Sequence, residues 1–254
     1  MDSAGLILYE FPCNEKIRMY LRLEHLFGQF NWFCAQNSSI AHHAALSTIF
    51  DLTDASARSD LKNELLQELD RERLALQAAK SAASGSADVD ASLEALARVS
   101  QEIRRTVGRS GQSIRDNEWL QLIRTRQSIA GGTCSFDMPM LHYWLSLPDD
   151  VRRAELEEWV RLMRPIEKAV GLVLDHIRGT VSECECTAEN GMHQLPLGGR
   201  KCLLLQIWLP KGEALIPEVS VNKYMLWMRF SRPDEKRKLH IARERVLFKL
   251  GICG

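Results

Sequence analysis

The chain has 254 residues, of which 45% are hydrophobic and 26% are charged, so it is long enough for one large domain or two modest ones and too apolar for a globally disordered protein. Its 33 Lys and Arg residues equal its 33 Asp and Glu residues, which gives a formal net charge of zero. This balance argues against a protein whose whole surface binds nucleic acid, although it allows local basic patches.

The apolar segments and the cysteines indicate a cytoplasmic protein. No apolar run approaches the ~20 residues that a membrane-spanning helix needs, and the apolar patch at residues 6–8 is too short for a secretory signal. The seven cysteines are odd in number and scattered, unlike the even set of a small disulfide-bonded secreted protein. We therefore expect reduced thiols.

The first predicted elements are a strand at residues 6–11, which Pro12 ends, and a helix that begins after Asn14. Asn14 is a suitable N-cap, and Glu15 places a negative charge in the first turn, where it suits the helix dipole. Two stripes repeat along this helix at three- and four-residue steps, one apolar and one mostly basic. They predict a buried face of Ile17, Tyr20, Leu23, Phe27, Phe30 and Cys34, and a polar face of Arg18, Arg22, His25 and Gln29.

Three more helices are predicted before residue 109. The first covers residues 40–50, the second follows Ser59, and the third ends near Gly108. Small and polar residues at 81–86 separate the second helix from the third and predict a flexible connection. Two long amphipathic helices joined in this way predict an antiparallel hairpin. Its apolar residues are Leu61, Leu65, Leu69, Leu76, Leu93, Leu96, Ile103 and Val107.

Glycines and prolines divide the next region into further helices. The helix after Gly131-Gly132 is expected to have Ser135 or Asp137 as its cap, and Pro139 is tolerated because it lies in the first turn. The other helices are expected to begin at Asp116, Pro148 and Pro165. The last of them carries a buried stripe of Ile166, Val170, Val173 and Ile177.

The pattern changes after residue 178. Residues 180–200 are rich in glycine, proline and polar side chains and predict a long connection, whereas short apolar runs at 203–209, 224–230 and 246–250 predict strands. Because three strands make a thin sheet, we hypothesise that residues 6–11 join them as a fourth. The predicted fold class is α+β, predominantly α-helical, with a helical domain at residues 13–179 followed by a smaller antiparallel β-rich domain at 180–254.

Two groups of residues suggest catalysis or metal binding, and simpler interpretations are favoured for both. Cys134, Asp137 and His142 resemble a nucleophilic triad, but such triads are assembled by the fold and seldom by sequence proximity. A zinc site is disfavoured because structural zinc sites place two or more residues between paired cysteines, and Cys184 and Cys186 have one. We predict no catalytic residue, no metal site and no cofactor. The other candidate zinc ligands are His176, His193 and Cys202.

Basic residues are concentrated in two regions. One cluster lies among the predicted helices and the other in the strand-rich end, where acidic residues are few in the sequence. Such asymmetry attracts an anionic partner and raises its association rate. The clusters comprise Arg98, Arg104, Arg105, Arg109, Arg115, Arg124 and Arg126, and Lys223, Arg229, Arg232, Lys236, Arg237, Lys238, Arg243, Arg245 and Lys249.

Three segments of the chain are long and idiosyncratic. They are NEKIRMYLRLE at residues 14–24, ELLQELDR at residues 64–71, and residues 127–145, which include GGTCSFD and PMLHYWL. Together they resemble the ZapD family of bacterial cytoplasmic proteins. The likeness covers most of the chain and becomes weaker from residue 180 onward.

The resemblance implies a non-enzymatic homodimer that acts at the mid-cell division site. Its implied partner is the C-terminal tail of the tubulin-like division protein FtsZ, which carries acidic and apolar residues, and whose filaments the family bundles. The residues that match basic family positions are Arg22, Arg58, Arg115, His142, Lys223 and Arg229. At two further positions where the family has a basic residue, this chain has Glu118 and Met225. The basic loop at residues 232–245 is expected to compensate for these two missing positive charges.

Two other functions compete with this interpretation. The first is a nucleic-acid-binding protein that uses the C-terminal basic cluster, and it predicts binding with a steep dependence on salt. The second is an enzyme built on Cys134 and His142, and it predicts a thiol that is selectively reactive at neutral pH.

Overall fold

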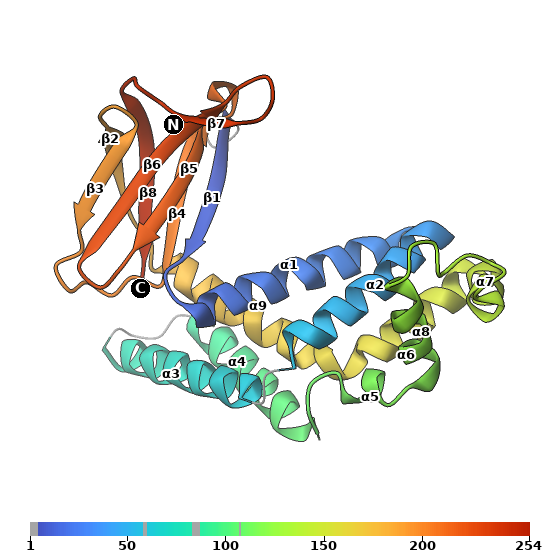
Figure 1. Cartoon of the computed structure of the whole chain (residues 1–254). Helices are drawn as coiled ribbons and strands as arrows, with labels where there is room; N and C mark the ends of the chain where they lie inside the picture. The colour runs from blue at the N-terminus through green and yellow to red at the C-terminus, as the bar shows by residue number, and fades with distance from the viewer. Residues whose placement is uncertain (1–4, 58–59, 83–86, 107) are drawn as a thin grey trace. The chain divides into compact units, whose positions relative to one another are not determined.

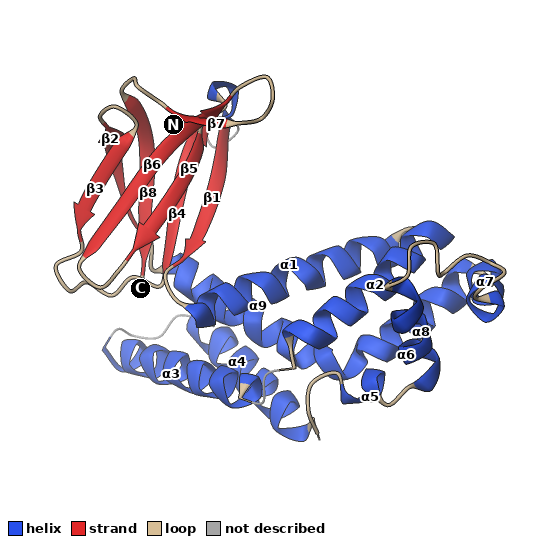
Figure 2. Cartoon of the chain, in the orientation of Figure 1, coloured by secondary structure: helices blue, strands red, loops and turns tan. Residues whose placement is uncertain are grey.

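The computed structural model describes residues 5–57, 60–82, 87–106 and 108–254. They fold into two compact units, of which one, the β unit, contains the described residues up to Met19 together with Leu174–Gly254. The other, the helical unit, is Tyr20–Val173 (Figure 1). Helices and antiparallel sheets are segregated along the chain, which confirms the predicted α+β class (Figure 2). The predicted domain limits at 13–179 and 180–254 stay a prediction.

The first sheet of the β unit joins the two ends of the chain. Strands β1 (Leu6–Pro12), β4 (Leu204–Pro210), β8 (Val246–Cys253) and β2 (Ser182–Ala188) lie side by side in that order, and all neighbours are antiparallel. The register of β1 on β4 places Leu8 opposite Trp208 and Phe11 opposite Leu205. The hypothesis that residues 6–11 join the C-terminal strands is therefore confirmed for the predicted strands at 203–209 and 246–250. The prediction of a single sheet is wrong, because the predicted strand at 224–230 belongs to a second sheet.

The second sheet packs against the first and closes the core. Strand β6 (Met225–Pro233) lies between β3 (Met192–Pro196) and β5 (Ile216–Val221), and β7 (Leu239–Ile241) also pairs with β6. In β6 and β8 alternate residues point into the core between the sheets, as the two-residue period of a strand requires. The ring centroids of Phe230 and Phe248, one from each sheet, lie 4.7 Å apart in this core.

The prediction of a connection at residues 180–200 is wrong, because this segment contains β2 and β3, and β5 and β7 were also not predicted. Strand β2 has the sequence SECECTA and lies at a sheet edge, so its polar side chains face solvent and no apolar run identifies it. The turn between β2 and β3 is Asn190-Gly191, with φ of 52° and 70°. Asn-Gly is the preferred pair for a two-residue hairpin turn, and this signal predicts the strands on either side of it.

The helical part of the chain begins with α1, whose N-cap was predicted correctly. Asn14 Oδ1 accepts a hydrogen bond from the Ile17 amide at 2.9 Å, which confirms Asn14 as the N-cap of α1. The predicted stripes of α1 and of α9 are buried. The helices are α1 (Glu15–Ala35), α2 (Ser39–Ala55), α3 (Leu61–Ala82), α4 (Ala87–Arg105), α5 (Gln112–Arg115), α6 (Glu118–Gln127), α7 (Pro139–Ser146), α8 (Asp149–Val160) and α9 (Arg164–Gly179).

Several helix limits differ from those predicted. Asn117, and not Asp116, caps α6, since its side chain accepts a hydrogen bond from the Leu120 amide at 3.1 Å. Met138 occupies the N-cap of α7, so neither Ser135 nor Asp137 caps that helix. Helices α3 and α4 pack together as the predicted hairpin, while residues 83–86 of their connection and Val107 lie outside the described residues. No helix in the described part of the chain is long and apolar enough to cross a membrane.

Candidate functional site

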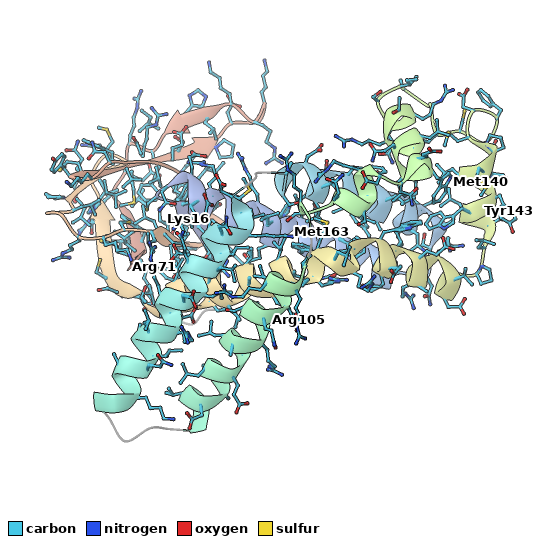
Figure 3. All side chains as sticks on the ribbon, turned by 90° about the horizontal axis from the view of Figure 1, so that it is seen from below. Lys16, Arg71, Arg105, Met140, Tyr143 and Met163 are labelled. Atoms are coloured by element: carbon cyan, nitrogen blue, oxygen red, sulfur yellow. The ribbon has the colours of Figure 1, made fainter. Side chains whose placement is uncertain are left out.

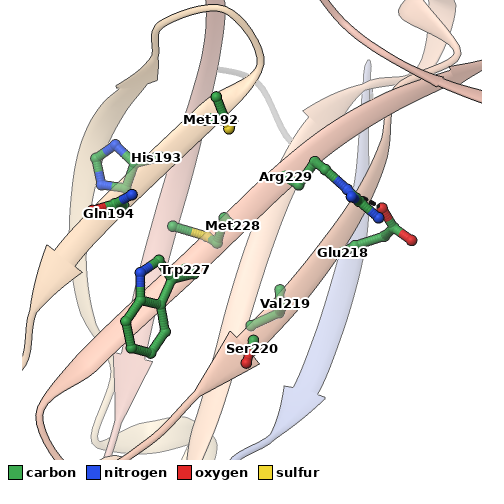
Figure 4. A pocket seen from close by; sticks show the side chains of 9 residues that line it. All are labelled: Met192, His193, Gln194, Glu218, Val219, Ser220, Trp227, Met228 and Arg229. Atoms are coloured by element: carbon green, nitrogen blue, oxygen red, sulfur yellow. Dashed lines mark hydrogen bonds and ion pairs between the residues drawn. The ribbon is translucent and has the colours of Figure 1, made fainter.

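A shallow pocket of about 260 Å³ lies on the β3-β6-β5 sheet of the β unit. In strand β6, Leu226, Met228 and Phe230 are buried in the core, so Trp227 and Arg229 point to the opposite face. The two-residue period of this strand therefore places an indole and a guanidinium side by side on the outer surface (Figure 4).

The neighbouring strands complete two rows of side chains across this face. The first row is Met192 on β3, Arg229 on β6 and Glu218 on β5. The second row is Gln194, Trp227 and Ser220, directly beside the first. Long apolar side chains in adjacent rows of a sheet make one continuous surface. The pocket thus combines an apolar floor with one ion pair at its edge.

The ion pair of Arg229 is exposed to solvent. Its Nε donates to Oε2 of Glu218 at 2.6 Å, and the two side chains are 52% and 43% exposed. The hydrogen bond from Arg229 lowers the pKa of Glu218, and the same bond raises the pKa of Arg229. Exposed pairs of this kind contribute little net stability, because water solvates both partners when they separate. A carboxylate from another molecule can therefore replace Glu218 at small cost.

The apolar part of the pocket is also accessible. Met192 is 54% exposed and Trp227 is half-buried on the outer face of the sheet. Tryptophan is enriched in binding surfaces because it contributes a large rigid apolar area. A peptide that carries both acidic and apolar side chains would find partners for both kinds in this pocket.

Carboxylates form ion pairs with several members of the C-terminal basic cluster. Arg232 donates to Glu244 at 2.6 Å, and Lys249 pairs with Glu183 of β2 at 2.5 Å. Arg245 lies 3.6 Å from Glu189. The surplus of positive charge is therefore smaller than the sequence of this region suggests, since Glu183 and Glu189 come from a segment more than fifty residues away.

The loop between β6 and β7 keeps an excess of positive charge. Oδ1 of Asp234 accepts hydrogen bonds from the backbone amides of Lys236 and Lys238 at 2.9 Å each, and Oδ2 lies 3.0 Å from Nε2 of His240. This turn leaves the side chains of Lys236, Arg237 and Lys238 exposed. Among the described residues, no carboxylate forms an ion pair with these three side chains.

Lys223 lies in a different pocket of the β unit. It occupies the connection between β5 and β6, with its Nζ 5.8 Å from the centroid of the Tyr224 ring. The pocket beside it has a volume of about 240 Å³ and is also lined by Arg200 and Asn222. Arg229 does not line this pocket, so the two predicted residues of the β unit belong to separate surfaces.

The other predicted residues belong to the helical unit. Arg22 is exposed on α1, and His142 is exposed on α7, where Met140 and Tyr143 are also 58% and 59% exposed (Figure 3). Arg115 donates to the backbone carbonyls of Thr53, at 3.4 Å, and Ser110, so its guanidinium holds the connection before α5. The last predicted residue, Arg58, lies outside the described residues.

The candidate catalytic and metal-binding groups have simple local roles. The Cys134 thiol donates to Oδ2 of Asp137 at 3.3 Å, and within the described residues no hydrogen bond connects His142 to either of them. Cys184 and Cys186 lie on β2 and not in the predicted loop. In the described ranges, no group of three or more His, Cys, Asp or Glu side chains is arranged to hold a metal ion.

Sequence reasoning found Arg229 and did not find Trp227, Met192 or Glu218 as its neighbours. The two-residue period of a strand, counted back from the charged Arg229, was a usable signal for Trp227. Met192 and Glu218 lie on strands that were not predicted, so their position beside Arg229 could not be inferred.

Comparison with known proteins places the whole chain in one group. A family model described as "ZapD: Cell division protein" matches residues 21–229. "Cell division protein ZapD" of Bordetella petrii is 38% identical over 255 residues, which cover 98% of this chain and 100% of that protein. The proteins of the same name from Cupriavidus metallidurans and Ralstonia pickettii are 39% and 40% identical, and each alignment covers 98% of this chain and 100% of the relative.

Proposed function

The chain belongs to the ZapD family of cell division proteins, and from this premise we propose that it binds the C-terminal tail of FtsZ and cross-links FtsZ filaments into bundles. The resemblance of the three sequence segments to this family is thereby confirmed. Membership of a family of cell division proteins agrees with the prediction that the chain is not an enzyme. In this proposal the protein acts in the cytoplasm at the mid-cell division site, without a cofactor.

The observation that carries the proposal is the outer face of the β3-β6-β5 sheet. Arg229 offers a guanidinium whose present partner, Glu218, is exposed, and Trp227 and Met192 offer apolar surface beside it. A tail that contains acidic and apolar residues can pair a carboxylate with Arg229 and bury an apolar side chain against Trp227. The guanidinium can bind a carboxylate in a bidentate manner, which a lysine cannot do.

Bundling requires that one protein assembly bind tails from two filaments at the same time. We propose a symmetric homodimer, because a two-fold assembly presents the same tail site twice. Each contact can be weak, since many tails along a filament raise the effective concentration at the second site. Arg22, Arg58, Arg115, His142 and Lys223 are proposed as further contacts of the tail.

A charge reversal at Arg229 tests the proposal. We expect Arg229→Glu to reduce binding of an FtsZ tail peptide at least tenfold, because two carboxylates would then face the acidic tail, and to abolish bundling in a sedimentation assay. The matched control is Arg161→Glu in the helical unit. Arg161 is also exposed and also donates to a neighbouring carboxylate, Glu158, at 2.8 Å, so this variant has the same change of charge in the same kind of pair.

Two outcomes would contradict the proposal. One is undiminished tail binding by Arg229→Glu, and the other is undiminished bundling of FtsZ polymers that lack the tail. Binding and bundling should also weaken as salt is raised, because the screening length falls to about 8 Å at physiological ionic strength.

A second candidate function is nucleic-acid binding through the β6–β7 loop. It is favoured by the side chains of Lys236, Arg237 and Lys238, which are exposed and form no ion pair with a carboxylate in the described part of the chain. It predicts that unrelated DNA binds with a steep salt dependence and that Arg229→Glu weakens this binding less than replacement of the three loop residues does. Tail-peptide binding without DNA binding would reject it.

A further inference from the structure

Two cysteines that are far apart in the sequence meet in the β unit. Cys13 is the first residue after β1, and Cys202 lies two residues before β4. The pairing of β1 with β4 continues past the strands, since the Cys13 amide donates to the carbonyl of Leu203 at 2.9 Å. This pairing brings the Sγ atoms of Cys13 and Cys202 to 2.9 Å from each other. The two thiols are therefore in direct contact, and both are half-buried.

The geometry is suitable for a disulfide bond. A disulfide has an S–S distance of about 2.05 Å, so the sulfur atoms need to approach by less than 1 Å. The other close pair of thiols is Cys184 and Cys186, with Sγ atoms 3.5 Å apart. These two residues are on one strand with one residue between them, so their Cα atoms are about 6.7 Å apart, at the upper limit for a disulfide. Cys13 and Cys202 are on adjacent segments and do not have this restriction.

The Cys13–Cys202 pair is accessible from solvent. Both side chains line the pocket of about 240 Å³ that also contains Arg200 and Lys223. Cys253, the neighbouring thiol, is fully buried. A small oxidant can therefore reach Cys13 and Cys202 from the pocket, whereas Cys253 is shielded. Positively charged side chains at the opening favour a thiolate and attract anionic reagents.

The two thiols are not equivalent. Either thiol can donate in the hydrogen bond between them, and the bond lowers the pKa of Cys202 where Cys13 is the donor. The same bond, together with burial, raises the pKa of Cys13. A thiolate reacts far faster than a thiol, so in the arrangement in which Cys13 donates, Cys202 attacks an oxidant first and Cys13 resolves the product.

We propose that Cys13 and Cys202 are a redox modification site, at which a peroxide converts the two thiols into an intramolecular disulfide. In the first step the Cys202 thiolate attacks one peroxide oxygen, the O–O bond breaks, and Cys202 becomes a sulfenic acid while hydroxide leaves. In the second step the Cys13 sulfur attacks the Cys202 sulfur, the S–O bond breaks, and a second hydroxide leaves. Both hydroxides become water with the two thiol protons. The peroxide is thus reduced by two electrons, and a dithiol reduces the protein disulfide back to two thiols by thiol–disulfide exchange, becoming a disulfide itself.

The test is disulfide mapping of the full chain. Purified reduced protein is treated with an equimolar amount of hydrogen peroxide, alkylated, digested without reduction and analysed by mass spectrometry. We expect a cross-linked peptide that contains Cys13 and Cys202, a loss of two free thiols, and full reversal by dithiothreitol. The cross-link should also raise the midpoint of thermal unfolding by roughly 5 °C, because it closes a very long loop in the unfolded chain.

Single variants separate the two roles. In Cys13→Ser, Cys202 should accumulate as a sulfenic acid that dimedone labels, whereas in Cys202→Ser, Cys13 should stay unmodified. Cys184→Ser is the matched control and should form the cross-link at the same rate as the unaltered chain. The proposal would be overturned if Cys13 and Cys202 were both still alkylated after treatment, or if a Cys184–Cys186 disulfide formed first. Mapping of the unaltered chain decides the question even if a variant does not fold.

Discussion

Two arginines, Arg152 in the helical unit and Arg229 in the β unit, show how differently the two units use the same side chain. Arg152 is 5% exposed, and every nitrogen of its guanidinium has a partner. Its Nε donates to Nδ1 of His42 at 3.0 Å, its Nη1 to the carbonyls of Leu145, at 2.9 Å, and Leu147, and its Nη2 to Asp149. Among the described residues Arg229 has one ion-pair partner, Glu218, and both side chains are exposed.

This contrast indicates which arginines can bind a ligand. When a buried guanidinium moves away from its partners, several buried polar groups lose their hydrogen bonds, and this costs free energy. An exposed guanidinium exchanges one carboxylate for another at little cost. Charge in the sequence is therefore a poor guide to binding by itself, and the number of partners that each cation already has is a better one.

The largest effect is expected from Arg152→Ala. This change leaves Nδ1 of His42 and two carbonyls without their donor, so we expect a loss of about 3–5 kcal/mol in the free energy of unfolding. Urea denaturation followed by tryptophan fluorescence measures it, because Trp119, Trp144 and Trp159 form one cluster in the helical unit with ring centroids 5.5–5.9 Å apart. Arg161→Ala, at an exposed site, is the control. Equal stability of the two variants would contradict the contrast between buried and exposed arginines.

The next effect is expected from Trp227→Ala. Removal of the indole takes away the apolar floor beside Arg229, and we expect tail-peptide affinity to fall about tenfold or more. Isothermal titration at two salt concentrations measures this. The salt dependence should stay as in the unaltered protein because Arg229 is still present. Trp32→Ala on α1, where the indole is also exposed, is the control, and an equal loss in both variants would count against the pocket.

A third prediction concerns how the free energy of unfolding depends on pH through two histidines, of which His42 accepts a hydrogen bond from Arg152. Burial lowers the pKa of His42, with a further contribution from the Arg152 charge, and burial also lowers the pKa of His43. A histidine with a lowered pKa binds a proton more readily in the unfolded chain, so stability is present above the ordinary pKa of about 6.5 and is lost as the pH falls below it. The urea midpoint should therefore decrease between pH 7.5 and 5.5.

The variant His42→Gln checks the origin of this pH effect. It should show a smaller decrease of the urea midpoint over the same pH interval, whatever its midpoint at pH 7.5. An unchanged pH dependence in this variant would show that the effect arises elsewhere.

The smallest effect is expected from Glu218→Gln. This change removes the carboxylate that competes for Arg229, so we expect tail-peptide affinity to rise about two- to threefold, with little change in stability. Fluorescence anisotropy with a labelled tail peptide resolves a change of this size. Glu158→Gln removes the equivalent partner of Arg161 and should leave affinity unchanged. A fall in affinity for Glu218→Gln would mean that Glu218 itself contacts the tail.

Local signals predicted most of the helical elements. The stripe of α1 and its Asn14 cap, the α3–α4 hairpin and the buried stripe of α9 all follow from periods of three and four residues within one segment. Strand β1 was also predicted from a single segment, as a short run that Pro12 ends. The strands that were not predicted lack a clear apolar pattern within their own segment. Strand β2 is an example, since its side chains are polar because it is an edge strand.

The candidate site was predictable only in part. Arg229 was found through the family resemblance, but its neighbours come from strands that contribute one residue each to a row across the sheet. The same resemblance pointed to Arg115, whose guanidinium the structure shows donating to backbone carbonyls. Its proposed role in binding the tail stays a prediction.

Patterns within short segments were sufficient to predict the helices and the family, because each depends on residues that are close together or on motifs that are read directly. The return of the first strand to the sheet was only a hypothesis, since its partner strand β4 lies near the other end of the chain. Which basic side chains are accessible to a ligand, and which cysteine thiols are in contact, depend on the tertiary structure. Arg229 and Glu218, Arg152 and His42, and Cys13 and Cys202 are 11, 110 and 189 residues apart. Hydrogen bonds and ion pairs act over a few ångströms in space, so the distance along the chain carries no information about them.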